Sequence, residues 1–167
     1  MKKSLNLFIK ISLVGYIIFI IYAMFLNSRG YWSKMSLGEY LLFQSNFIPF
    51  NTITFYIKSI FDGSINPDIP IINLSANLLM FLPAGLYLPY YTKRIKTIKS
   101  CVIIMLIILL FIELIQFFTR RGSFDIDDLI LNILGVVIGY LIWKTKFVQR
   151  LLKGDMKDKS ANEKPPV

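Results

Sequence analysis

The sequence predicts an all-α membrane protein that crosses the bilayer four times, and three observations support this fold class. Hydrophobic residues make up 55% of the 167 residues and charged residues only 17%, with a mean hydropathy of +0.59. This balance is too apolar for a disordered chain and too poor in charge for the surface of a soluble domain. Four apolar stretches approach the roughly 20 residues that a spanning helix needs. The basic residues, finally, are distributed unevenly around these stretches.

Each span is predicted from its apolar length. The first contains a single charge, Lys10, and no small-residue cleavage site follows it, so we interpret it as a retained helix rather than a signal peptide. The second contains Pro83 and Gly85, which favour a kink. The fourth contains Gly135 and Gly139, a spacing typical of close helix packing. The predicted spans are residues 8–26, 71–91, 101–118 and 128–143, which form one transmembrane domain over residues 1–143, followed by a basic tail over residues 144–167.

The distribution of positive charge predicts the topology. Of the 19 lysines and arginines, fourteen lie in the N-terminal segment, in the loop between the second and third spans, and in the tail. The other five lie in the two segments on the opposite side. Because basic loops stay on the cytoplasmic side of a membrane, both termini are predicted to be cytoplasmic in a multi-pass protein of the cell membrane. The net charge of +9 is therefore a topology signal, and nucleic-acid binding is not expected.

The segment over residues 27–70 is predicted to face outward. It contains apolar stretches that are each too short to span the bilayer. Residues 52–61 are predicted to form an amphipathic helix that lies in the membrane interface, with Lys58 extending toward water. A re-entrant dip into the bilayer is the less favoured alternative.

Polar side chains of three spans are predicted to meet in one layer near the outer face. With a rise of about 1.5 Å per residue, Asn77, Glu113 and Asn132 lie roughly 6–9 Å below the outer ends of their helices. An ionisable group at such a depth needs partners and indicates a functional site. The short loop before the fourth span adds further charges. The predicted ligand-binding residues of this outward-facing pocket are Asn77, Glu113, Gln116, Arg120, Arg121, Asp125, Asp128 and Asn132.

These residues also have structural interpretations. The amides and Glu113 can join neighbouring helices by hydrogen bonds. Asp127 or Asp128 can cap the start of the fourth helix. For the pair Gly135 and Gly139, helix packing is favoured over ligand binding. The prediction of a pocket therefore depends on the group of polar residues and not on any one of them.

Three blocks of these residues resemble the VanZ-like family. The likeness covers residues 46–140, and the order and spacing of the blocks are specific although each block alone is weak. Arg120 and Arg121 are both candidates for the arginine position of the family, and Arg121 is favoured because the run Arg-Gly-Ser-Phe-Asp is in register. The first block is Asn46 to Ile53, the second is the Asn-x3-Phe-x-Pro-x-Gly pattern from Asn77 to Gly85, and the third comprises Glu113, Gln116, Arg121, Asp125, Asp128, Asn132 and Gly135.

The resemblance implies a role at the cell envelope. The founding member of the family is associated with resistance to the glycopeptide antibiotic teicoplanin, and the abundance of Ile, Lys and Asn suits an AT-rich Gram-positive genome. We expect a binding protein in which Arg121, with Arg120, contacts an anionic head group, while the apolar residues 47–61 cover its chain. The expected partners are membrane lipids, lipid-linked cell-wall precursors or lipoglycopeptides. A homo-oligomer is left open, and no cofactor or metal is expected.

Two other classes of protein are retained as alternatives. An intramembrane enzyme could act on a lipid-linked phosphate through carboxylates, alone or with a divalent metal. The carboxylates available to it are Glu113, Asp125, Asp127 and Asp128. The chain has no histidine, the usual general base, and Cys101 lies in an apolar run near the cytoplasmic end. A transporter is less favoured because the inner halves of the spans hold few groups that could line a hydrophilic path.

Overall fold

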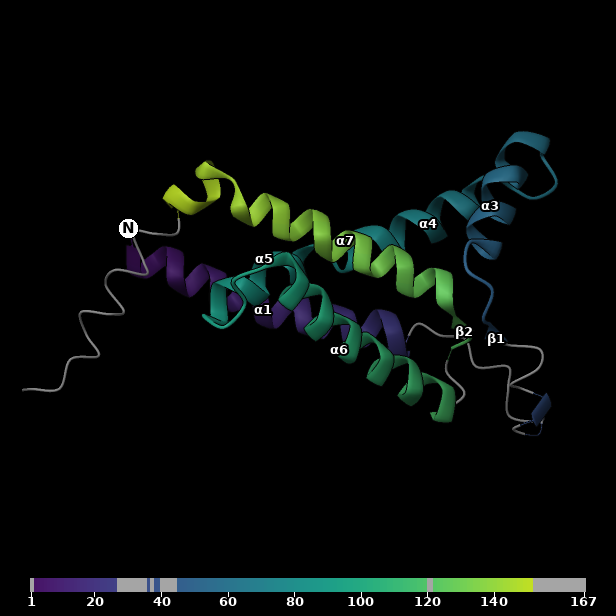
Figure 1. Ribbon diagram of the computed structural model, residues 1–167, viewed down its shortest axis with the longest axis horizontal. Coiled ribbons are helices and arrows are strands. Elements are labelled where there is room, and N and C mark those ends of the chain that lie inside the picture. Colours follow the sequence, from purple (N-terminus) through teal and green to yellow (C-terminus); the bar gives the residue numbers. More distant parts are fainter. Residues whose placement is uncertain (1, 27–35, 37, 40–44, 120–121, 152–167) are drawn as a thin grey trace, which may run out of the picture.

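The computed structural model describes residues 2–26, 36, 38–39, 45–119 and 122–151 of the chain. These residues are mainly helical (Figure 1). The elements in chain order are α1 (Lys2–Ile21), the π-helix η1 (Tyr22–Leu26), β1 (Ser45–Asn46), α3 (Asn51–Asp62), α4 (Asp68–Met80), α5 (Leu82–Tyr91), α6 (Ile98–Thr119), β2 (Phe124–Asp125) and α7 (Ile126–Lys144).

Four helical segments are long and apolar enough to cross a membrane, which confirms the predicted all-α membrane fold. They are Ser4–Phe25, Asp68–Tyr91, Ile98–Thr119 and Ile126–Lys144. Each begins two to four residues before its predicted start. The reason is that the first helical turns contain polar residues, such as Asp68 and Asp127, which a span predicted from its apolar residues does not include. The predicted tail over residues 144–167 is described only as far as residue 151.

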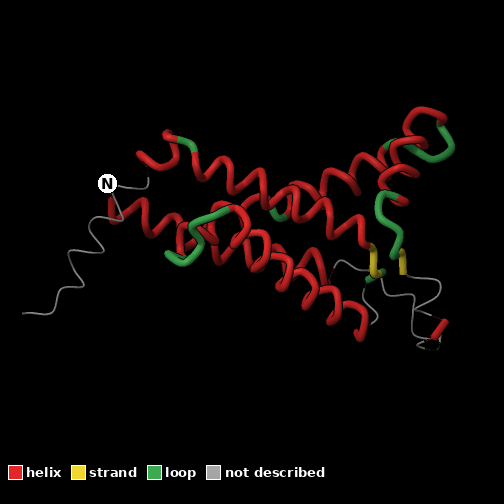
Figure 2. The backbone as a smooth tube through the Cα atoms, viewed as in Figure 1, coloured by secondary structure: helices red, strands yellow, loops and turns green. Residues whose placement is uncertain are grey.

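The bundle has two chemically different ends (Figure 1). The start of α1, the connection between α5 and α6, and the end of α7 lie together at one end, which we call the basic end. There the hydroxyl of Tyr140 donates to the carbonyl oxygen of Lys96 at 2.9 Å, and the Lys144 ammonium donates to the same oxygen at 3.4 Å. The opposite end, which we call the strand end, carries β1, β2 and α3, as Figure 2 shows.

The second span is broken into two helices, as Pro83 predicts. α4 ends at Met80, Phe81 adopts φ −100° and ψ 1°, and α5 begins with Pro83 in its first turn. Proline has no N–H to donate to the preceding turn, and its ring clashes with that turn. The carbonyl oxygen of Met80 is left outside the helical pattern and accepts a hydrogen bond of 3.1 Å from the hydroxyl of Tyr16 in α1.

In the middle of the bundle, α7 approaches the second span backbone to backbone. A Cβ atom built on Gly135 would lie 2.0 Å from the carbonyl oxygen of Leu78, and one on Gly139 would lie 2.0 Å from that of Leu82. A Cβ on Gly85 of α5 would meet the backbone of α7 at 2.1 Å. These glycines therefore form a close-packing surface, which confirms the packing interpretation of the Gly135–Gly139 pair.

α1 is held to the bundle mainly at separate polar points. Of the 18-residue apolar stretch that defines each span, only 6% is buried in the first span, against 44% in α7. Besides the bond from Tyr16, the hydroxyl of Tyr87 in α5 donates to Ser12 Oγ at 2.9 Å. At the strand end, Gln116 Nε2 of α6 donates to the carbonyl oxygen of Met24 at 2.8 Å. Sparse attachment of this kind leaves space between α1 and its neighbours.

α3 confirms the helix predicted over residues 52–61. It ends at Gly63, which has φ +68° and donates to the carbonyl oxygen of Ser59 at 3.1 Å. Ser59 is buried, whereas Phe61 is 85% exposed, so the helix has two unlike faces. Figure 1 shows α3 beside α4 at the strand end, away from the basic end.

The glycine contact predicts a large effect of a single methyl group. In Gly139→Ala the new Cβ would overlap the carbonyl oxygen of Leu82 unless α5 and α7 separate, so we expect a loss of about 1–3 kcal/mol or more in stability. Thermal unfolding in detergent can be followed with a thiol-reactive dye, because Cys101 is the single cysteine and is fully buried.

Gly15→Ala in α1 is the matched control for this experiment. A Cβ on Gly15 meets nothing within 4 Å, and alanine forms helices better than glycine. The midpoint temperature of thermal unfolding should therefore stay the same or rise slightly. Equal midpoints for Gly139→Ala and the wild type would contradict the backbone contact.

Candidate functional site

A cavity of about 360 Å³ lies at the strand end, among the ends of η1, α4, α6 and α7. Five of the eight predicted ligand-binding residues line it: Asn77, Glu113, Gln116, Asp128 and Asn132. The remaining lining residues are Ala23, Met24, Asn73, Met80, Gly122 and Ser123. The polar layer expected from helix spacing is therefore a cavity built by three spans and the end of the first.

Hydrogen bonds within the cavity wall join α4 to α7. Asn77 Nδ2 donates to a carboxylate oxygen of Asp128. The same amide lies 3.4 Å from Asn73 Oδ1, one turn earlier in α4. The bond to Asp128 is an interhelical hydrogen bond of the kind that polar residues form inside a membrane, whereas the contact with Asn73 lies within α4. Gln116 has a similar role, because its bond to Met24 serves a carbonyl at the end of η1 that has no partner within the helix.

Two other lining residues have polar atoms that nothing in the described part of the chain satisfies. Glu113 is 5% exposed and Asn132 is 2% exposed. Glu113 Oε2 and Asn132 Oδ1 are buried and have no hydrogen-bond partner among the described residues. Both atoms are hydrogen-bond acceptors. A buried polar atom without a partner costs about 1–3 kcal/mol, so the cavity presents acceptors suited to a ligand that donates hydrogen bonds.

Asp125 has a structural role outside the cavity lining. Its carboxylate accepts from the backbone N–H of Asp127 at 2.8 Å and so caps α7. The interpretation that Asp127 or Asp128 caps this helix is therefore wrong. Asp125 has the extended backbone of a capping residue, whereas the other two already belong to the first helical turn. Asp125 also accepts from Asn46 Nδ2 at 3.0 Å and from Thr52 Oγ1 at 2.6 Å.

Asp127 fixes the start of α3. Its side chain is fully buried and accepts from the backbone N–H of Phe50 at 2.5 Å and of Ile53 at 3.0 Å. Phe50 has φ 64°, which is unusual for a residue with a side chain. We call this set of contacts the aspartate clamp, which comprises Asp125 and Asp127 with their partners Asn46, Phe50, Thr52 and Ile53.

A short parallel pairing supports the aspartate clamp. β1 and β2 pair Ser45 with Phe124 and Asn46 with Asp125, and the rings of Phe47 and Phe124 lie 5.0 Å apart. The sequence alone does not indicate the roles of Asn46 and Thr52 or this pairing. Its one signal is the motif from Asn46 to Ile53, whose residues have no evident physical function until the fold is known. The aspartate clamp explains that motif as the attachment of the segment before α3 to the start of α7.

Acidic groups dominate the electrostatics of the described strand end. Burial, followed by the neighbouring carboxylates of Asp128 and Asp125, raises the pKa of Tyr56 in α3. Arg120 and Arg121, both predicted to bind ligand, lie outside the described residues. In the chain they directly precede Gly122 and Ser123, which line the cavity.

The aspartate clamp predicts that Asp127→Ala loosens the start of α3. Two backbone N–H groups would lose a charged acceptor, and such hydrogen bonds contribute about 1.5–3 kcal/mol each. Hydrogen exchange of a peptide covering residues 47–54 should therefore become faster. Asp68→Ala, at an exposed acidic residue in the first turn of α4, is the control and should leave this exchange unchanged. Unchanged protection in Asp127→Ala would refute the clamp.

Comparisons with known proteins identify the family. The model of the VanZ/LLP1 family matches residues 13–149, which is more than half of the chain. Every residue that lines the cavity lies within this range. Searches among curated proteins and among solved structures give no match. The cavity and the aspartate clamp are thus features of the matched domain, and the chain belongs to the VanZ/LLP1 family.

Proposed function

We propose that the cavity at the strand end binds the polar head group of an anionic membrane amphiphile, such as a phospholipid or a lipid-linked envelope precursor. The observation that carries this proposal is the buried carboxyl of Glu113, whose Oε2 has no partner among the described residues although it lines a cavity of about 360 Å³. An ionisable group within a membrane span is costly and generally functional. A hydroxyl, amide or ammonium donor of a head group would satisfy both Glu113 and Asn132.

The anionic part of the head group requires positive charge, which the described lining does not supply. Arg120 and Arg121 are the two cations next to the lining residues in the chain, and their planar guanidinium groups suit a phosphate through paired hydrogen bonds. This assignment rests on the sequence. It selects head groups that combine a phosphate with hydrogen-bond donors, as glycerol phosphates and phosphosugars do.

The distribution of basic residues supports placing the strand end at the outer face of the cell membrane, with both termini in the cytoplasm. Head-group binding would then occur in the outer leaflet. In view of the family to which the chain belongs, we extend the proposal to reduced susceptibility to teicoplanin-type antibiotics. Binding, and not chemical change, of the amphiphile is the activity proposed here.

One observation favours a second candidate function. Glu113 and Asp128 come from different helices and line the same cavity, so the site holds two carboxyl groups that could act as an acid and a base on a lipid-linked phosphate. In the binding protein the bound lipid is recovered unchanged. In the enzyme it is converted, and Asp128→Asn would abolish the conversion.

The binding proposal predicts loss of lipid in Glu113→Gln and in Arg121→Ala. Either change removes one charged hydrogen-bond partner of the head group, worth about 1.5–3 kcal/mol, or about 10–100-fold in affinity. Gently purified protein is examined by lipid mass spectrometry, and the same variants are tested for teicoplanin susceptibility in a sensitive Gram-positive host. Both variants should lose the bound lipid and the protection.

Glu39→Gln is the matched control, because Glu39 is an exposed glutamate whose carboxylate accepts, among the described residues, from Ser36 three positions earlier. It should behave as the wild type. If Glu113→Gln and Arg121→Ala retain both lipid and protection in well-inserted protein, the assignment of the site is wrong.

A further inference from the structure

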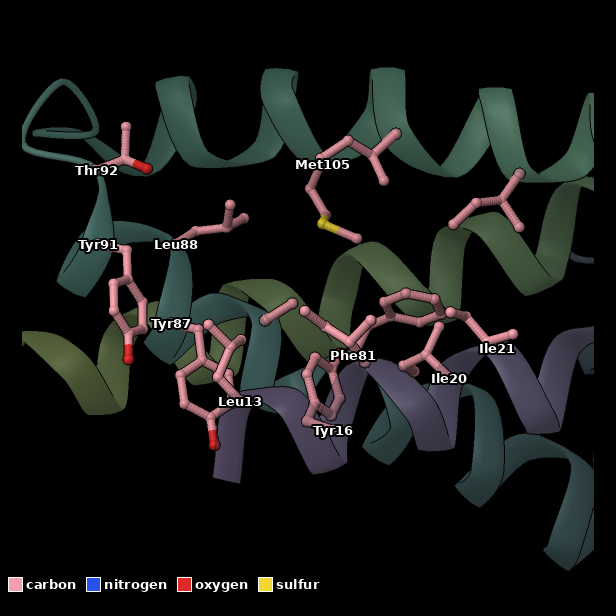
Figure 3. A pocket seen from close by; sticks show the side chains of 14 residues that line it. Leu13, Tyr16, Ile20, Ile21, Phe81, Tyr87, Leu88, Tyr91, Thr92 and Met105 are labelled. Carbon is pink, nitrogen blue, oxygen red and sulfur yellow. The ribbon is translucent and has the colours of Figure 1, made fainter. Parts of the chain in front are cut away.

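A second cavity lies inside the membrane-spanning part of the bundle, between α1 on one side and α5 and α6 on the other. Its volume is about 350 Å³, at the lower end of the roughly 300–1,000 Å³ typical of small-molecule sites. Figure 3 shows Leu13 and Tyr16 of α1 around the same space as Leu88 and Met105 from the opposite wall. Along α1 it extends from Leu13 to Ile21, or roughly 12 Å at the helical rise. We call this cavity the apolar groove.

The apolar groove is lined mainly by apolar side chains. Tyr91 and Thr92 line the part of it nearest the basic end. The other two tyrosines that line it have hydroxyls that already donate elsewhere: Tyr16 to the carbonyl oxygen of Met80, and Tyr87 to Ser12 Oγ. What they present to the groove is therefore the aromatic ring. These two bonds also attach α1 to the end of α4 and to α5, on either side of the break in the second span.

The apolar groove and the cavity at the strand end, which we now call the polar cavity, are lined by neighbouring residues of the same elements. Phe81 lines the groove and the preceding residue, Met80, lines the polar cavity. On α6, Ile112 lines the groove and Glu113 the polar cavity. Along the first span, the groove ends at Ile21 and the cavity begins at Ala23. A polar cavity and an apolar groove therefore lie next to each other along three elements, an order that suits the two parts of one amphiphile.

We propose that the apolar groove holds one hydrocarbon chain of the same amphiphile whose head group occupies the polar cavity, an inference that rests on the function proposed above. It differs from the sequence-based expectation, in which residues 47–61 cover the chain. The apolar groove runs from the polar cavity toward the basic end, so a chain in it would lie along the bilayer normal between α1, α5 and α6.

Burial of apolar surface cannot make this groove selective, because lipid tails are as apolar as the groove itself. Selectivity must come from the head group. If the inference is correct, occupancy of the groove depends on the polar cavity. A groove filled by bulk lipid has no such dependence.

The experiment uses the full-length chain in phosphatidylcholine vesicles that contain a small amount of a photoreactive probe. One probe, which we call the glycerol probe, is a phosphatidylglycerol with a diazirine on an acyl chain, and its head group combines a phosphate with hydroxyl donors. The other, which we call the choline probe, is a phosphatidylcholine with the same labelled acyl chain. After irradiation, labelled residues are mapped by mass spectrometry, and retained probe is counted in unirradiated, gently purified protein. The glycerol probe is expected to label Leu88 and Met105 in clear excess over the choline probe.

Two pairs of variants sharpen the test. Ile17→Trp fills the apolar groove from α1, whereas Ile18→Trp places the same side chain next to it, at a 62% exposed position that does not line the groove. Ile17→Trp should lower labelling of the groove about tenfold, which corresponds to roughly 1.4 kcal/mol in the free energy of binding the hydrocarbon chain. Ile18→Trp should leave the labelling unchanged. Glu113→Gln should reduce the glycerol probe's labelling of the groove to the level of the choline probe, and Glu39→Gln should not.

Three results would overturn the inference, and they differ in what they say about the proposed function. Retention of the glycerol probe that depends on Glu113, with labels outside the groove, leaves head-group binding intact and rejects the groove. Equal groove labelling by both probes, unaffected by Glu113→Gln, shows bulk lipid in the groove. Absence of any head-group preference in retention as well as in labelling contradicts head-group binding and the groove together.

Discussion

The backbone contact between the second span and α7 is the constraint on which the rest of the structure depends. Gly135 and Gly139 bring α7 against the carbonyl oxygens of Leu78 and Leu82, with no side chain between them. In a bilayer, where lipid competes for every apolar surface, such close approach is a main source of helix association. The contact also places the polar face of α4 beside α7, so that Asn77 reaches Asp128.

The charges at the strand end separate into two groups with different surroundings. Asp125 and Asp127 have their oxygens occupied by backbone and side-chain donors, and they attach the start of α3 to α7. Glu113, in contrast, lines a cavity with an oxygen that nothing described satisfies. The first arrangement is that of a structural joint. The second arrangement is the one on which the proposed head-group site rests, because a buried polar atom is costly unless something satisfies it.

The spans could be predicted from the sequence because lipid requires every backbone polar group to be satisfied within a helix. The break near Pro83 and the packing glycines followed from local stereochemistry. The roles of Asp125 and Asp127 could not be predicted, because three neighbouring aspartates have the same chemistry and their partners lie 73–79 residues away in the chain. The apolar groove could not be predicted either. It depends on the positions at which Tyr16 and Ser12 attach α1 to the second span, and not on the composition of α1.

The most direct test of the proposed head-group site asks whether its polar residues bind a ligand or only join neighbouring helices by hydrogen bonds. Replacing both partners of a buried polar pair by apolar groups can leave stability nearly unchanged, so Asn77→Leu combined with Asp128→Leu should still fold and insert. Native mass spectrometry then measures the lipid bound per protein. A head-group site predicts that the double variant keeps the thermal stability of the wild type and loses its bound lipid. Unchanged lipid binding together with a clear loss of stability would contradict the account.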